Sequence, residues 1–96
     1  MLILITYDVN TTTSAGRRRL RMVAKKCAAH GTRVQNSVFE CVLDNSRYKL
    51  LKHELEQLID ISCDSLRFYT LGNNYQSKVV HIGVKEIFQI EGDLIL

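Results

Sequence analysis

The stretch that decides the fold is Leu2-Ile3-Leu4-Ile5-Thr6-Tyr7-Asp8-Val9, near the beginning of a chain of 96 residues. Side chains alternate between the two sides of an extended strand, so apolar groups fall on both sides here. Such a strand is typical of the centre of a sheet that is covered on both faces. We therefore expect a buried central strand over residues 2–9, with Asp8 on the side shared by Leu2, Leu4 and Thr6.

The residues that follow predict a regular succession of helices and strands. Asn10–Ser14 contains residues that cap helix N termini, which predicts a helix from about Thr13 that Gly31 ends. Its apolar side chains recur at helical spacing, at Leu20, Val23, Ala24 and Cys27. The pattern then predicts strands at Thr32–Gln35, Ser37–Leu43, Ser65–Leu71 and Lys78–Val84, and a second helix from the cap residues Asp44–Ser46 to about Ile61.

This order of elements, β-α-β-β-α-β with an extra strand at the C-terminal end, is typical of an α+β domain with a ferredoxin-like fold. The expected domain spans residues 1–96 and has four antiparallel strands with both helices on one face. Because two helices cover only one face, the simplest cover for the other is a second copy of the chain. We expect a homodimer packed sheet to sheet, in which residues from about 85 to 96 form a strand that binds the dimer partner or another protein.

Positive charge is concentrated in the first helix and the strand after it. Between Asp8 and Glu40 the chain has no acidic residue but several basic ones: Arg17, Arg18, Arg19, Arg21, Lys25, Lys26 and Arg33. At about 100° per residue, Arg18, Arg21 and Lys25 lie together opposite the apolar stripe, and Arg19 and Lys26 form a second row. A solvated helix face usually carries both signs of charge, so this imbalance favours contact with nucleic acid. Since no base-reading pattern accompanies it, binding should be independent of base sequence.

Asp8 is the candidate catalytic and metal-binding residue. The simpler interpretation is that its carboxylate caps the loop after the strand. A carboxylate beside a dry sheet face is unfavourable, however, unless a cation or hydrogen-bond donors meet it. A twofold axis would bring two copies of Asp8 together, and two facing carboxylates can hold one Mg²⁺ per dimer that activates water for attack on a phosphodiester.

The other metal-binding residue types are scattered. The three cysteines and three histidines lie far apart in the sequence and form no pair with zinc-ligand spacing. Free thiols of this kind fit a reducing compartment. The apolar run Leu2–Ile5 is far too short for a signal sequence, so we expect a soluble, cytoplasmic protein.

Three segments together resemble a known family. Tyr7-Asp8-Val9 ends the first strand, Gly16-Arg17-Arg18-Arg19-Leu20 opens the helix, and Arg33–Glu40 forms the following hairpin. In this combination they are similar to the second CRISPR-associated (Cas) protein family, the small ferredoxin-like proteins of spacer acquisition. The similarity covers essentially the whole chain in length and element order.

The resemblance implies a homodimeric, Mg²⁺-dependent endonuclease that acts on RNA or DNA, with Asp8 as the metal-binding residue. It also implies a complex with dimers of the first Cas protein, the integrase subunit, in which duplex DNA lies along the basic surface. The residues that we expect to bind nucleic acid are Arg17, Arg18, Arg19, Arg21, Lys25, Arg33, Ser37 and Phe39. Ser37 and Phe39 fit simpler roles equally well, in a turn and in the core. Asn10–Ser14 is neutral where some members carry further acids, which weakens the expected metal site.

Two functions follow from these patterns. The first is a metal-dependent endonuclease, and the alternative is a non-catalytic, dimeric DNA-binding scaffold that docks the integrase through the apolar segment Ile87–Leu96. A sensor of small molecules is a weaker interpretation, because the chain has no Gly-rich ligand loop. The patterns do not identify the preferred nucleic acid or a general base.

Overall fold

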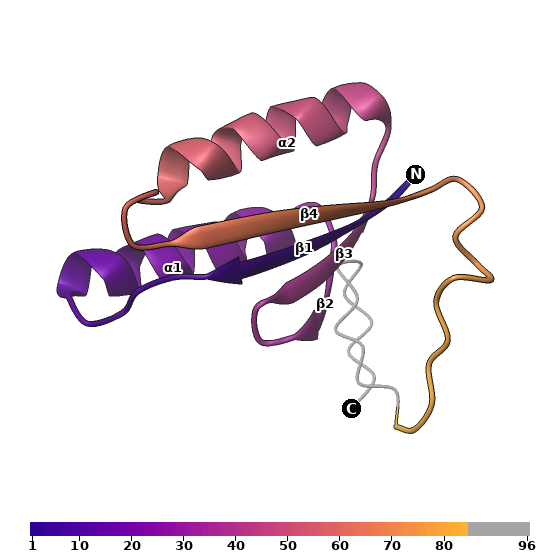
Figure 1. The fold of residues 1–96 in the computed structure, drawn as a ribbon, viewed down its shortest axis with the longest axis horizontal. Helices are drawn as coiled ribbons and strands as arrows, with labels where there is room; N and C mark the ends of the chain where they lie inside the picture. Colours follow the sequence, from indigo (N-terminus) through magenta and orange to yellow (C-terminus); the bar gives the residue numbers. More distant parts are fainter. Residues whose placement is uncertain (85–96) are drawn as a thin grey trace.

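The computed structural model describes residues 1–84 and shows a four-stranded antiparallel sheet with two helices (Figure 1). The elements in chain order are β1 (Leu2–Asp8), α1 (Ser14–Ala28), β2 (Thr32–Gln35), β3 (Val38–Val42), α2 (Asn45–Leu58) and β4 (Ser65–Gly72). The strands follow the spatial order β2-β3-β1-β4, so β1 is a central strand. This is the ferredoxin-like arrangement that the sequence predicts.

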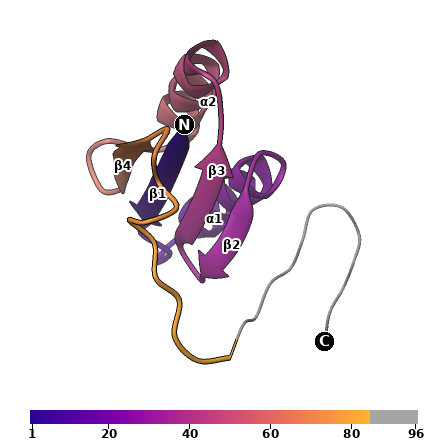
Figure 2. The same ribbon diagram turned by 90° about the vertical axis from the view of Figure 1, so that its right-hand side faces the viewer.

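Both helices pack on the same face of the sheet (Figures 1 and 2). The core between the layers contains Ile3, Ile5 and Tyr7 of β1, Phe39 and Cys41 of β3, Val23 and Cys27 of α1, and Leu51 and Leu55 of α2. Burial raises the pKa of Cys27 to about 12 and that of Cys41 to about 11, so both thiols stay protonated in the core. The even-numbered side chains of β1, which include Asp8, point to the opposite face, called the open face below.

The loop between β1 and α1 is closely packed. Thr13 is the N-cap residue of α1, and its side-chain oxygen accepts a hydrogen bond from the backbone N–H of Gly16 at 3.0 Å. A Cβ atom added at Gly16 would collide with the backbone carbonyl oxygen of Asn10. A glycine is therefore required where the first turn of the helix contacts the end of the strand.

The expectation that Gly31 ends the first helix is wrong. The helix ends at Ala28, and its C-cap is Ala29, which has right-handed backbone angles. Gly31 instead lies against β3, where a Cβ atom would collide with the Cys41 thiol and the Glu40 carbonyl. The glycine is needed for this close packing rather than for a left-handed helix cap.

The predicted strand at Lys78–Val84 is also wrong, because this segment pairs with no strand in the part of the chain that the structure describes. Val80, Ile82 and Val84 are 78%, 89% and 86% exposed. An alternating pattern forms a strand only beside another strand that can pair with it. The predicted strand within residues 85–96 lies outside the described residues. No helix among residues 1–84 is long and apolar enough to cross a membrane.

Candidate functional site

Asp8 is the last residue of β1 and is exposed on the open face. Its neighbour across the sheet is Ser65, the first residue of β4. Within residues 1–84 the Asp8 carboxylate has no hydrogen-bond or ion-pair partner. The loop-capping role belongs to Asn10 instead, whose side-chain oxygen accepts the backbone N–H of Thr12 at 3.0 Å. The carboxylate of Asp8 is thus accessible to an external cation.

The donor set fits a hard cation but is incomplete in one chain. An exposed carboxylate suits Mg²⁺ or Mn²⁺, which prefer oxygen ligands. However, residues 1–84 contain no group of three or more His, Cys, Asp or Glu side chains that could hold a metal ion. Among residues 1–84, fewer than three such side chains can therefore meet at Asp8, and a second copy of Asp8 would strengthen the site.

The basic residues of α1 divide into two rows, as the helical spacing predicts. Arg18, Arg21 and Lys25 are exposed, and none of them pairs with an acid in the described part of the chain. We call these three residues the outer row. Figure 1 shows that the first turns of α1 lie at the same end of the sheet as the end of β1. The outer row is a cationic surface available to phosphate groups.

The second row is neutralised by acids from distant parts of the sequence. Lys26 contacts Glu54 of α2, with Nζ and Oε2 2.6 Å apart. Arg19 contacts Asp64, with Nε and Oδ2 2.8 Å apart. The sequence predicts that Arg19 binds nucleic acid, but in the structure its ion pair with Asp64 competes with such binding. Arg17 is exposed and donates a weaker hydrogen bond to the Thr11 carbonyl at 3.3 Å.

Asp64 is the residue that sequence reasoning missed. Its side chain is fully buried, and the Arg19 guanidinium, with the backbone N–H groups of Asp60 and Asn10, holds the pKa of Asp64 well below its usual range. In the sequence Asp64 is an ordinary loop acid just before a strand. No local pattern marks it as buried, because its partner Arg19 lies 45 residues away.

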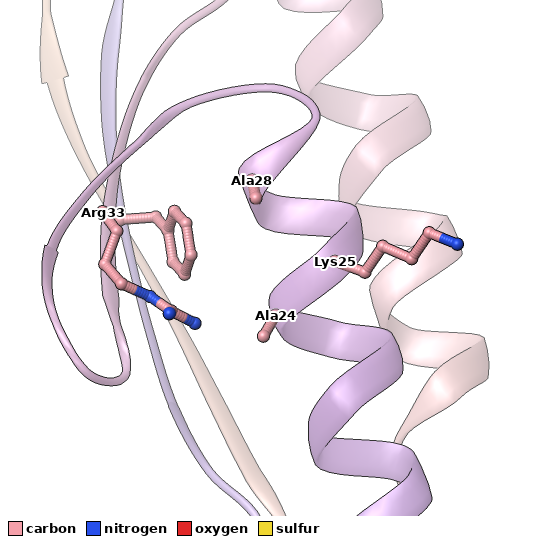
Figure 3. Close-up of a pocket in the computed structure, with 5 residues that line it drawn as sticks. Ala24, Lys25, Ala28 and Arg33 are labelled. Carbon is pink, nitrogen blue, oxygen red and sulfur yellow. The ribbon is translucent and has the colours of Figure 1, made fainter. Parts of the chain in front are cut away.

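Arg33, Lys25 and Phe39 line one shallow groove of about 430 Å³ together with Ala24 and Ala28 (Figure 3). The Arg33 guanidinium lies over the Phe39 ring, 5.1 Å from its centroid. Figure 3 shows that the Lys25 side chain points away from Arg33. The cationic groups therefore do not converge on one point in this groove.

Phe39 is a core residue in this structure. Its ring is 1% exposed and stacks on Tyr7, with centroids 6.2 Å apart. Of the two roles expected for Phe39, the core role fits its position, and direct contact with nucleic acid does not. Ser37 lies in the turn between β2 and β3, where its carbonyl accepts the Tyr7 backbone N–H at 3.1 Å. The Arg33 and Phe39 side chains point to the helix side of the sheet, opposite to Asp8.

Comparisons with known proteins agree on one family. The family model described as CRISPR associated protein Cas2 matches residues 1–79. The chain is 57% identical to the "CRISPR-associated endonuclease Cas2" of Halalkalibacterium halodurans, with 99% of each chain covered. It is 55% identical to the "CRISPR-associated endoribonuclease Cas2" of Chlorobaculum tepidum, with all of both chains covered.

The chain is also similar in fold and sequence to solved structures. The crystal structure of Streptococcus pyogenes Cas2 at pH 6.5 is 55% identical and superposes with a TM-score of 0.75, covering 86% of this chain and 100% of that one. A hypothetical protein from Thermus thermophilus, TT1823, is 31% identical with a TM-score of 0.69, covering 86% of this chain and 90% of that one.

Proposed function

Because the chain belongs to the Cas2 family of CRISPR-associated proteins, we propose that it is a metal-dependent endonuclease that hydrolyses phosphodiester bonds as a homodimer. The observation that carries the proposal is the exposed, unpartnered carboxylate of Asp8 at the end of the central strand, in the part of the chain that is described. Nuclease names of relatives that are more than half identical support the same activity.

The open face of the sheet supports the proposed homodimer. This face carries a patch of apolar and aromatic side chains, formed by Leu4 of β1, Val42 of β3 and Tyr69 of β4. Val42 is 62% exposed and Tyr69 43% exposed in the single chain. Packing two such patches together would remove them from water and bring the two Asp8 residues to one interface.

The proposed cofactor is one Mg²⁺ per dimer, held by the two Asp8 carboxylates. When bound, the ion supplies Lewis-acid chemistry at a phosphoryl oxygen and lowers the pKa of a water molecule. The outer row of α1 positions the substrate by binding its phosphates. Because these contacts are made to the backbone, cleavage should show little dependence on base sequence.

The substitution Asp8→Asn tests the endonuclease activity directly. It keeps the size of the side chain but removes its charge, so Mg²⁺-dependent cleavage of labelled RNA and DNA should fall by at least about 100-fold. The matched control is Glu56→Gln, which neutralises an exposed acid on α2 and should cleave like the parent protein. Cleavage by Asp8→Asn at the parent rate, or equal cleavage in chelator, would rule the proposal out.

A second function, a non-catalytic scaffold that joins DNA to the first Cas protein, is favoured by a separate observation. Val80, Ile82 and Val84 are almost fully exposed and have no strand beside them in the described residues. Such a segment is suited to pair with the edge of another protein. Both functions can belong to one dimer, since they use different surfaces.

Binding to the purified first Cas protein separates the two functions. Asp8→Asn should bind it and duplex DNA as the parent does, whereas the double substitution Ile82→Lys and Val84→Lys should weaken protein binding by at least about 10-fold. Leu50→Lys is the control, because Leu50 is equally apolar and 59% exposed but lies on α2. If the double variant binds normally, this segment is not the docking site.

A further inference from the structure

We propose that Asp64 is a positioning residue that holds the chain on both sides of Asp8 and keeps Arg19 away from nucleic acid. The part that concerns metal binding at Asp8 rests on the proposed nuclease function. The part that concerns the loop and Arg19 does not depend on it.

The Asp64 carboxylate joins its own loop to two segments that are distant in the sequence. It accepts hydrogen bonds from the backbone N–H of Asn10 in the β1–α1 loop at 2.9 Å and from that of Asp60 after α2 at 2.8 Å. It also accepts two from Arg19 of α1, from Nε at 2.8 Å and from a terminal nitrogen at 3.4 Å. The Asp64 side chain is 0% exposed and that of Arg19 is 21% exposed.

The network reaches Asp8 from two directions. Asn10 lies two residues after Asp8, so the hydrogen bond from its N–H fixes the chain that leaves β1. Ser65 follows Asp64 directly and lies opposite Asp8 in the sheet. Asp64 therefore holds both the segment that follows Asp8 and the start of the strand beside it.

Separating Asp64 from Arg19 would be unfavourable. A carboxylate that is shielded from solvent must accept hydrogen bonds or pair with a cation. Here the backbone N–H groups of Asn10 and Asp60 donate the hydrogen bonds, and Arg19 is the cation. The strongly lowered pKa of Asp64 agrees with this pairing. If Arg19 turned toward a phosphate, it would leave a buried carboxylate with only its two backbone donors and the weakly donating Cys63 thiol. Arg19 is thus a structural partner, although it lies in a run of arginines.

The first test uses Asp64→Asn and reads the loop directly. Backbone amide exchange of Asn10 should become at least about 10-fold faster, because its acceptor loses its charge. Mn²⁺, used alone as the probe, should broaden the NMR signals around Asp8 at concentrations at least about 5-fold higher than for the parent protein. Glu54→Gln is the control: it breaks the other ion pair of α1 and should leave both readouts unchanged.

A purely structural role for Asp64 predicts a different result. In that case the thermal stability of Asp64→Asn and of Glu54→Gln would fall, while the Asn10 exchange rate and the Mn²⁺ affinity of the folded protein stayed at parent values. This outcome would overturn the proposal. If Asp64→Asn does not fold, Arg19→Gln serves instead, since it removes the charged guanidinium and keeps the carboxylate. If the parent protein itself fails to bind Mn²⁺ or to cleave, the proposed nuclease function fails, and the exchange rate of Asn10 still decides the role of Asp64.

The second test asks whether Arg19 binds phosphate. Arg18→Gln should reduce the slope of log affinity against log salt for duplex DNA by about 0.9 for each phosphate that is no longer neutralised, because Arg18 is exposed in the outer row. Arg19→Gln should leave that slope within error of the parent value. An equal reduction in both variants would show that Arg19 leaves Asp64 to bind nucleic acid and would overturn this part of the proposal.

Discussion

At the scale of single residues, surroundings separate side chains of the same type. Arg18 and Arg19 are neighbours in the sequence, yet one is exposed and the other is bound to a buried carboxylate. Asp8 and Asp64 differ in the same way, since Asp8 is exposed and the Asp64 carboxylate is enclosed by hydrogen-bond donors. An acid that is met by donors contributes to stability, and an acid without them is available to an external ion.

The lowered pKa of Asp64 predicts how stability depends on pH. Since the pKa in the folded state lies below the ordinary value of about 3.9, the contribution of Asp64 is complete above about pH 4 and is lost as the pH falls below it. Asp64→Asn should lower the free energy of unfolding by about 3 kcal/mol at pH 7. In urea denaturation, the difference in the free energy of unfolding between the parent protein and the variant should become smaller from pH 4 toward pH 2. A difference that stayed constant would contradict the ionised state of Asp64.

At the scale of elements, the joint between β1 and α1 depends on one glycine. Alanine normally stabilises a helix relative to glycine by about 1 kcal/mol. At Gly16 the expected sign is reversed, because a Cβ atom would press on the Asn10 carbonyl. Gly16→Ala should therefore lower the free energy of unfolding by about 2 kcal/mol, measured by chemical denaturation. Comparing Met22→Ala with Met22→Gly gives the ordinary preference at an exposed position of the same helix. Stabilisation by Gly16→Ala would show that the loop can move away.

The elements were predictable where periodicity decides them, and the partners of the side chains were not. Apolar side chains on both sides of Leu2–Asp8 predict a central strand that carries Asp8 on the side of Leu2, Leu4 and Thr6, and the structure shows both. The helical spacing also separates the outer row from the row of Arg19 and Lys26. It could not reveal that both members of the second row meet acids, because those ion pairs join residues 45 and 28 positions apart. The strand expected at Lys78–Val84 was wrong because strand formation also requires an adjacent edge.

At the scale of the whole molecule, helices cover one face of the sheet, and the other face is open in residues 1–84. Tyr69 and Leu4 are neighbours on the open face. If this face forms the proposed dimer, Tyr69→Glu should convert a dimer at micromolar concentration into a monomer, because it places a charge in an apolar interface. Sedimentation equilibrium measures the change. Leu50→Glu adds the same charge on α2 and should remain dimeric. A dimer that persists with Tyr69→Glu would place the interface elsewhere.

The outer row of α1 also has a length that can be compared with its substrate. Arg18, Arg21 and Lys25 are spaced three and four residues apart, so they extend over about 10 Å of helix axis. That is the rise of roughly three nucleotide steps in B-form DNA. The outer row can therefore lie along the sugar–phosphate backbone of one strand. An oligonucleotide of only one or two nucleotides would be too short to contact all three residues.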